Sequence, residues 1–492
     1  MVSSEREREY RERGFWRDDD TLARWLARHA TERPQAPALV AGGERVAWAA
    51  LAERVHRAAG ALARRGIVAG DVVAVQLPNV AEFVVAYLAV TRLGGVFCAL
   101  HMPYRGAEVE ALMRHSGARL AIVLPEAKPM FGGKGIAFGE LDAGTDAFDG
   151  RQPAASEPFL LLYTSGTTAA PKGVLHPYRT MLGNARLGAA EHCLSESDRV
   201  LCAAPFSHLY GLYSLHCAWA VGACTVLLPA FKPEALAAAV EQHRPSALWT
   251  APAHVAACLA AGLFERHDWS SLRLLIVSGS MAPPPLVREL AAKLPRCAVT
   301  QLWGMTELQA GLYTRPSDPP ERSATSAGRP SPGTEVRLGP DGELQVRGPL
   351  LFSGYLANPE ETARAFTDDG WFRSGDLAEQ DGEYFTITGR SKDLINRGGV
   401  KFNPAEVEML LDAHPKILQS ALVPMPDPVL GERACAFVVL RNPGDALTLE
   451  ELAAYLLGRN IAKNKLPERL VLVPEMPLTP TRKVIKGRLK LP

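Results

Sequence analysis

Residues 71–279 show a pattern of apolar and polar positions that is typical of a layered α/β domain. Short runs that are apolar throughout are followed by longer stretches with helical spacing. Strands that are apolar on both faces indicate a largely parallel sheet covered by helices on both sides. The expected strands include 71–77, 96–100, 118–124, 199–205, 224–228, 246–252 and 272–279. The expected helices include 81–94, 107–117 and 233–243.

Beyond Gly333 the pattern changes to short strands separated by Gly and Asp turns, as in residues 341–348 and 383–389. Such spacing predicts antiparallel hairpins. We expect these hairpins to follow the α/β sheets within one large N-terminal domain.

The composition shifts near Gly389, and a small α+β domain is expected after it. Its first helix is predicted to have Asn403 as N-cap and Pro404 at the first helical position. The elements expected in it include the helix 403–414, the strand 434–440 and the helix 447–458. The predicted domains are therefore residues 1–389 and residues 390–492.

The composition is that of a globular protein. The 492 residues are 47% apolar and 22% charged, which allows roughly three domain equivalents with buried cores and excludes wholesale disorder. Lys and Arg total 54 against 53 Asp and Glu, for a net charge of +1. No whole-molecule field therefore attracts nucleic acid or anionic lipid, and no nucleic-acid partner is expected.

The cysteine spacing and the N-terminal residues indicate in which cellular compartment the protein is expected. None of the eight cysteines forms a CxxC pair with metal spacing, which favours buried, reduced thiols over a metal site. The stretch MVSSEREREYRERGFWRDDD lacks the apolar core of a signal peptide. No later stretch reaches ~18 uninterrupted apolar residues. We therefore expect a cytoplasmic protein without membrane insertion.

The segment FLLLYTSGTTAAPKGV, residues 159–174, combines an apolar strand with a loop rich in hydroxyl groups and glycine. Hydroxyl and backbone N–H donors followed by the cation Lys172 suit a polyphosphate. Pro171 occupies the place of the second glycine in a GxxxxGK[ST] loop, so this is a different kind of phosphate loop. A Ser/Thr-rich surface loop is the alternative interpretation.

The segment QLWGMTELQAG, residues 301–311, ends a predicted strand with polar residues. Thr306 beside Glu307 offers a hydroxyl for a phosphate oxygen and a carboxylate for Mg²⁺. Trp303 offers a flat face for a purine. A strand end followed by a capping Thr is the alternative.

Two further segments carry charges in a suggestive order. Asp376 follows a Ser–Gly pair and could hold a ribose, as a carboxylate does in dinucleotide sites. Arg390 and Lys392 follow it, then the glycines of 398–399. The basic C-terminal tail contains Lys483 after a Pro/Thr turn. Taken one at a time, these charged residues are also explained by hairpin turns with solvated charges and by a basic tail.

Together and in this order, the four segments resemble the adenylate-forming superfamily of acyl-CoA synthetases, adenylation domains and luciferases, over nearly the whole chain. The resemblance implies a large N-terminal domain of α/β sheets plus a β-barrel-like part, and a small mobile C-terminal domain. It also implies a reaction in two steps. A carboxylate first attacks the α-phosphate of ATP and gives acyl-AMP and pyrophosphate. A thiol then displaces AMP, after the small domain has rotated. ATP, Mg²⁺ and coenzyme A are the implied cofactor and acceptor set.

The resemblance also implies roles for residues at matching positions. The phosphate loop matches Thr164, Ser165, Gly166, Thr167, Thr168 and Lys172. Further ATP- and AMP-binding positions match Gln301, Trp303, Asp376, Arg390 and Lys392, the last also at the hinge. Catalytic positions match Lys483, Thr306 and Glu307, with Glu307 as the metal ligand. Acyl-substrate positions match His208, Gly279, Ser280, Met281, Gly304 and Met305. The pantetheine tunnel matches Gly398 and Gly399.

Three residues depart from the family pattern. Ala169 replaces a glycine usual in the phosphate loop, and Arg482 stands where a glycine commonly precedes the catalytic lysine. Trp303 stands where the stacking aromatic residue is usually Tyr. The resemblance therefore fixes the geometry around Lys483 less firmly than that around Glu307.

The implied acyl pocket indicates the kind of acid. Residues 205–222 contain no Asp or Glu, which disfavours a free amino acid. Ala203 replaces the Asn of relatives that activate dihydroxybenzoate, which disfavours a 2-hydroxyaryl acid. An apolar acid of modest size is favoured by the side chains of Leu209, Tyr210, Leu212, Tyr213, Met281 and Met305. His208 matches a gate position, with a packed histidine as the alternative.

We expect an ATP-dependent acyl-CoA synthetase for an aromatic, alicyclic or medium-chain acid. Its partners would be the small carboxylic acid, ATP and CoA. A stand-alone adenylation enzyme that loads an acyl carrier protein is the alternative, because both acceptors present the same pantetheine arm. A catalytically idle nucleotide-binding protein is disfavoured because Lys483, Glu307 and Asp376 occur together.

Overall fold

The computed structural model describes residues 4–142, 148–164, 172–479 and 484–491. The chain forms two compact units. They are Met1–Glu335 with Arg347–Phe366, and Val336–Val346 with Thr367–Pro492. The expected mixed α/β class, with a large N-terminal and a smaller C-terminal part, is confirmed. The boundary between residues 389 and 390 stays a prediction.

A nine-stranded sheet forms one layer of the first unit, in the order β15-β14-β13-β12-β11-β9-β10-β1-β2. Strands β1 and β9 to β13 run parallel, and β2, β14 and β15 are antiparallel to their neighbours. Their bounds are β1 Pro37–Ala41, β2 Glu44–Ala47, β9 Arg199–Cys202, β10 Cys224–Leu227, β11 Ala247–Thr250, β12 Leu274–Ser278, β13 Ala298–Met305, β14 Gln309–Tyr313 and β15 Arg329–Pro330. Every residue of β10, β11 and β12 is buried, as the apolar runs predict.

A seven-stranded sheet forms the other layer, in the order β18-β8-β7-β4-β3-β5-β6. Its inner strands are parallel, and β8 and β18 are added antiparallel at one edge. Their bounds are β3 Val72–Gln76, β4 Val96–Ala99, β5 Leu120–Val123, β6 Gly135–Ala137, β7 Pro158–Thr164, β8 Lys172–Pro177 and β18 Gly354–Tyr355. The last strand comes from a distant part of the sequence.

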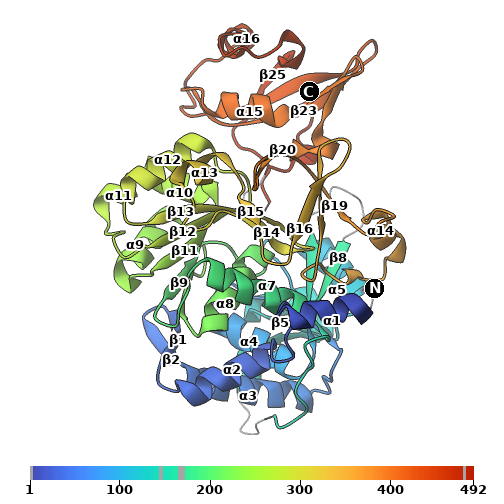
Figure 1. The fold of residues 1–492 in the computed structure, drawn as a ribbon. Coiled ribbons are helices and arrows are strands. Elements are labelled where there is room, and N and C mark those ends of the chain that lie inside the picture. The colour runs from blue at the N-terminus through green and yellow to red at the C-terminus, as the bar shows by residue number, and fades with distance from the viewer. Residues whose placement is uncertain (1–3, 143–147, 165–171, 480–483, 492) are drawn as a thin grey trace. The chain divides into compact units, whose positions relative to one another are not determined.

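Helices cover these sheets, and Figure 1 shows β9, β11, β12 and β13 side by side near α9, α10 and α12. The longer helices are α1 Ser4–Glu12, α2 Leu22–Glu32, α3 Trp48–Arg64, α4 Ala81–Arg92, α5 Gly106–Ser116, α7 Tyr178–Glu191, α8 Leu209–Val221, α9 Pro233–His243, α10 Pro252–Ala260 and α12 Pro284–Lys293. The short ones are η1 Pro125–Lys134, α6 Gly139–Asp142, α11 Leu263–Arg266, α13 Pro320–Thr325 and α14 Pro359–Arg364. No helix of the described residues is long and apolar enough to cross a membrane.

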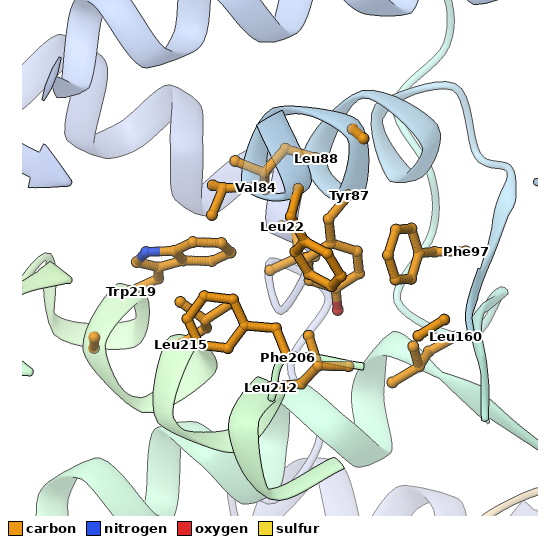
Figure 2. Packing of buried hydrophobic residues seen from close by; sticks show 14 of the residues in the cluster. Leu22, Val84, Tyr87, Leu88, Phe97, Leu160, Phe206, Leu212, Leu215 and Trp219 are labelled. Atoms are coloured by element: carbon orange, nitrogen blue, oxygen red, sulfur yellow. The ribbon is translucent and has the colours of Figure 1, made fainter. Parts of the chain in front are cut away.

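The main core lies between α4, α8 and the seven-stranded sheet. Figure 2 shows Tyr87 and Leu88 of α4 near Trp219 of α8, with Phe97 of β4 and Leu160 of β7 beside them. Tyr87 is fully buried, and its hydroxyl lies 2.8 Å from His216 Nε2. This packing anchors α8, the helix that follows the predicted gate position.

The N-terminal segment is tied to α7. Trp16 donates its indole N–H to the carbonyl of Pro349 at 2.8 Å, and Arg179 stacks on the Trp16 ring at 3.8 Å. Arg186 pairs with the buried carboxylate of Asp20 at 2.9 Å and also donates to the carbonyl of Phe15. These contacts fix the segment to the same body as the two large sheets.

The second unit contains antiparallel hairpins and the predicted small α+β part. Its sheets have the strand orders β16-β17-β19-β20 and β22-β21-β24-β23, with β25 added to β24. Their bounds are β16 Glu335–Leu338, β17 Glu343–Arg347, β19 Phe372–Asp381, β20 Tyr384–Arg390, β21 Ile395–Arg397, β22 Val400–Phe402, β23 Ile417–Asp427, β24 Gly431–Leu440 and β25 Arg469–Leu472. The helices are α15 Pro404–Asp412, α16 Leu449–Leu457, η2 Ser391–Asp393, η3 Lys463–Lys465 and η4 Lys486–Arg488. Asn403 caps α15 as predicted, because its side chain accepts the N–H of Ala405 at 3.0 Å.

We predict that Asp20→Asn lowers the free energy of unfolding by about 3 kcal/mol, because it leaves the guanidinium of Arg186 without its buried counter-charge. Differential scanning fluorimetry should show a lower melting temperature. Asp18→Asn is the matched control, since the Asp18 side chain is 78% exposed and pairs only at the surface with Arg11. Equal melting temperatures for the two variants would contradict this account of the N-terminal segment.

Candidate active site

The turn between β13 and β14 carries the predicted residues Thr306 and Glu307. Gly304 is required before this turn, because a Cβ there would lie 1.8 Å from the carbonyl oxygen of Gln309. Thr306 lies in the turn itself and caps no helix in the described chain. A tight β connection therefore presents the hydroxyl and the carboxylate at the end of the nine-stranded sheet.

Glu307 is 6% exposed, and its carboxylate accepts a hydrogen bond from the Tyr355 hydroxyl at 2.8 Å. The backbone of the same turn is held from two sides. The carbonyl of Glu307 accepts a hydrogen bond from the N–H of Phe352 at 2.8 Å, and that of Thr306 accepts one from His176 Nε2 at 2.6 Å. Burial lowers the pKa of His176 to about 4, so its ring is neutral at physiological pH. The turn is therefore rigidly placed.

Lys172 lies at the start of β8, opposite Thr164 at the end of β7. Its ammonium forms an ion pair with Glu361 and lies 5.5 Å from the centre of the Tyr355 ring. Tyr355 thus contacts both Lys172 and Glu307, two residues predicted from separate motifs. The remaining residues predicted for the phosphate loop, Ser165, Gly166, Thr167 and Thr168, lie outside the described residues, as does Ala169.

Gln301 and Trp303 lie on β13 before the turn. The Gln301 amide oxygen accepts the N–H of Ala282 at 3.0 Å, and its nitrogen donates to the carbonyl of Ser323 at 2.6 Å. Gln301 therefore ties the segment after β12 to β13. The Trp303 side chain is 9% exposed and lies against Gly311. Its stacking on a purine stays a prediction.

The segments predicted to line the acyl pocket follow β12 and precede α8. Gly279 has a φ of 97°, which favours glycine, and Ser280 and Met281 after it are exposed. Met305 is half-buried at the end of β13. Tyr210 of α8 is buried and donates its hydroxyl to the carbonyl of Ile276 in β12 at 2.8 Å. The first turn of α8 is therefore fixed against β12.

His208 is the N-cap of α8, and its Nδ1 accepts the N–H of Tyr210 at 3.2 Å. A neutral His208 ring therefore carries its proton on Nε2. The ring stacks on His101 with centroids 6.3 Å apart, and His101 Nδ1 lies 2.9 Å from the Ser207 hydroxyl. Burial lowers the pKa of His101 to about 4. The predicted gate residue His208 thus has a second imidazole, that of His101, stacked against it. The sequence indicated only His208.

The second unit brings together two of the predicted nucleotide-binding residues. Asp376 of β19 and Arg390 of β20 are register partners, and Nε of Arg390 lies 2.9 Å from Oδ1 of Asp376. Lys392 is exposed in η2. Gly398 and Gly399 form the tip of the β21–β22 hairpin with φ of 60° and 86°, as a type I′ turn requires. Lys483 and Arg482 lie outside the described residues.

A divalent metal fits this site only together with a ligand. The described residues contain no group of three or more His, Cys, Asp or Glu side chains that could hold a metal ion. Mg²⁺ is often held by one or two carboxylates plus the phosphates of a substrate. The single carboxylate of Glu307 fits that mode of binding, and the cation Lys172 contacts the same tyrosine as Glu307 does.

Comparison with known proteins identifies the family. The family model described as AMP-binding enzyme matches residues 26–356, and the model for the AMP-binding enzyme C-terminal domain matches residues 406–483. The chain is 31% identical to a medium-chain fatty-acid–CoA ligase of Escherichia coli (strain K12), over 99% of this chain and 93% of that protein. It is 34% identical to a salicyl-AMP ligase / salicyl-S-ArCP synthetase of Mycobacterium tuberculosis, over 98% of this chain and 92% of that protein.

A solved structure agrees with these sequence relatives. The anthranilate CoA ligase AuaEII in complex with anthranoyl-AMP superposes with a TM-score of 0.87 at 25% identity, over 96% of each chain. The predicted resemblance is thus confirmed by family models, relatives and fold alike. The chain belongs to the adenylate-forming family of AMP-binding enzymes and is an AMP-forming acid–thiol ligase.

Proposed function

We propose that the protein is an ATP-dependent acyl-CoA synthetase that acts through an acyl-AMP intermediate on an aromatic, alicyclic or medium-chain carboxylic acid. The observation that carries the proposal is the contact of Tyr355 with both Glu307 and Lys172. It joins the two motifs to which family resemblance assigns the metal and the phosphates. ATP, Mg²⁺ and CoA are the substrates and cofactor of this proposal.

The charges of the site suit the first step. A carboxylate and a triphosphate repel each other, so cations must offset their charge as the acid attacks the α-phosphate. Mg²⁺ bound at Glu307 would supply part of this compensation. Lys172 offers positive charge from the protein itself, and Thr306 offers a hydroxyl to a phosphate oxygen. The family resemblance assigns a further cation of this step to Lys483. In the second unit, Asp376 would bind the ribose, and Arg390 would orient that carboxylate through its 2.9 Å ion pair.

The acid is proposed from the apolar surroundings of the pocket segments. Tyr210 and Tyr213 of α8 are buried, and residues 205–222 contain no Asp or Glu to receive a substrate ammonium. Two of the relatives are named for a medium-chain fatty acid and for the aryl acid anthranilate. This range agrees with an apolar acid of modest size.

Loading of a carrier-protein thiol is the second candidate function, favoured by the likeness to the salicyl-S-ArCP synthetase. Product analysis with each acceptor separates the two. Many acyl-CoA molecules formed per enzyme with CoA alone would support the synthetase. The alternative result is a single burst of acyl-AMP with CoA, and turnover only with a carrier protein that bears phosphopantetheine. That result would refute the acyl-CoA synthetase and support the carrier-loading enzyme.

We predict that Lys483→Ala lowers the rate of acyl-AMP formation at least ~100-fold, because a cation is lost where charge develops. Thiolysis of supplied acyl-AMP should stay within about threefold of the wild-type rate. The control is Lys490→Ala, which removes an exposed lysine of the same tail. Equal loss of both half-reactions in Lys483→Ala would contradict the assigned role.

We also predict that Lys392→Pro slows the thiol step about tenfold or more while adenylation continues, because proline restricts the proposed hinge. Single-turnover measurements of each half-reaction provide the test. Lys392→Ala removes the side chain but keeps the backbone free, so it should slow thiolysis less than proline does. Thiolysis at the wild-type rate in Lys392→Pro would count against a hinge at this residue.

A further inference from the structure

Tyr355 is held in place by its backbone on both sides. It forms the short strand β18 with Gly354 and pairs with Val174 of β8, two residues after Lys172. Its N–H donates to the Thr362 hydroxyl at 2.9 Å, and the next residue, Leu356, donates its N–H to the carbonyl of Gly173 at 2.7 Å. The ring therefore projects from a fixed position at the edge of the seven-stranded sheet.

The side chain of Tyr355 contacts groups of opposite charge with its two parts. Its hydroxyl donates to Oε1 of Glu307, and its ring lies 5.5 Å from the ammonium of Lys172. Electron density on an aromatic face attracts a cation, whereas the hydroxyl is a donor to an anion. Glu361 pairs with the same ammonium from the neighbouring helix α14. One side chain thus contacts both Lys172 and Glu307.

The hydrogen bond from the Tyr355 hydroxyl bears directly on the orientation of Glu307. Because Oε1 of Glu307 accepts this hydrogen bond at 2.8 Å, the carboxylate group is held in one orientation.

We propose that Tyr355 is a positioning residue for the nucleotide-bound divalent cation, which it serves by orienting the carboxylate of Glu307 through its hydroxyl and the ammonium of Lys172 through its ring. This inference rests on the proposed function. Groups that hydrogen-bond to metal ligands typically change metal affinity 10–100-fold when they are removed. The two parts of the side chain can be removed separately.

Tyr355→Phe removes only the hydroxyl, and the readout is binding of α,β-methylene-ATP by isothermal calorimetry over a series of Mg²⁺ concentrations. We expect the Mg²⁺ concentration for half-maximal binding to rise about tenfold, with wild-type affinity restored at saturating Mg²⁺. Tyr355→Leu also removes the ring, so its nucleotide affinity should remain reduced at saturating Mg²⁺. An unchanged Mg²⁺ dependence in Tyr355→Phe would overturn the proposal.

The matched control is Tyr455→Phe in α16. Arg459 lies 3.5 Å from the centre of the Tyr455 ring, and the hydroxyl is buried with no hydrogen-bond partner among the described residues. This control should keep the wild-type Mg²⁺ dependence. A loss of affinity in Tyr355→Phe that excess Mg²⁺ does not restore would show a merely structural role and overturn the proposal.

Binding and catalysis test different claims. Calorimetry requires no acid, so it measures the role of Tyr355 even where the acid is unknown. A wild-type protein that binds the nucleotide with Mg²⁺ but activates no carboxylic acid would refute the proposed function and leave this inference standing. A wild-type protein that activates an acid, with Tyr355→Phe unchanged in its Mg²⁺ dependence, would refute the inference alone.

Discussion

The candidate site is organised around the buried carboxylate of Glu307. A charge at 6% exposure is costly unless donors or cations surround it. The Tyr355 hydroxyl supplies a donor, and Tyr355 reaches Glu307 because β18 pairs with β8. The same pairing places its ring beside Lys172. The return of the chain beyond residue 350 to the edge of the seven-stranded sheet thus brings a donor to this carboxylate.

Neutral imidazoles accompany these few fixed charges. Burial lowers the pKa of His101 and His176 to about 4 and that of His216 to about 3. Their rings therefore act near pH 7 as hydrogen-bonding groups without charge. In the first unit, the described charges near this turn include those of Lys172, Glu307 and Glu361, and Arg364 lies 3.8 Å from the Glu361 carboxylate.

Local sequence signals predicted helices and strands but did not predict contacts between residues far apart in the sequence. Apolar runs predicted β3, β4, β5 and β12, because a strand buried on both faces needs apolar side chains at every position. Asn403 and Pro404 predicted the start of α15, because capping depends on neighbouring residues. Tyr355 was missed because its function depends on contacts with residues 48 and about 180 positions away. The pairing of Asp376 with Arg390 was missed for a different reason, since a bulge after Leu377 shifts the register of their hairpin.

The central claim is that this chain activates a carboxylic acid as its adenylate. The most direct test is exchange of labelled pyrophosphate into ATP, with Mg²⁺ and no thiol, across benzoates, cyclohexane carboxylates and C4 to C12 fatty acids. We expect exchange that requires an acid, is strongest within one of these apolar classes and is absent with free amino acids. Exchange with none of these acids, under conditions where the protein binds ATP and Mg²⁺, would contradict it.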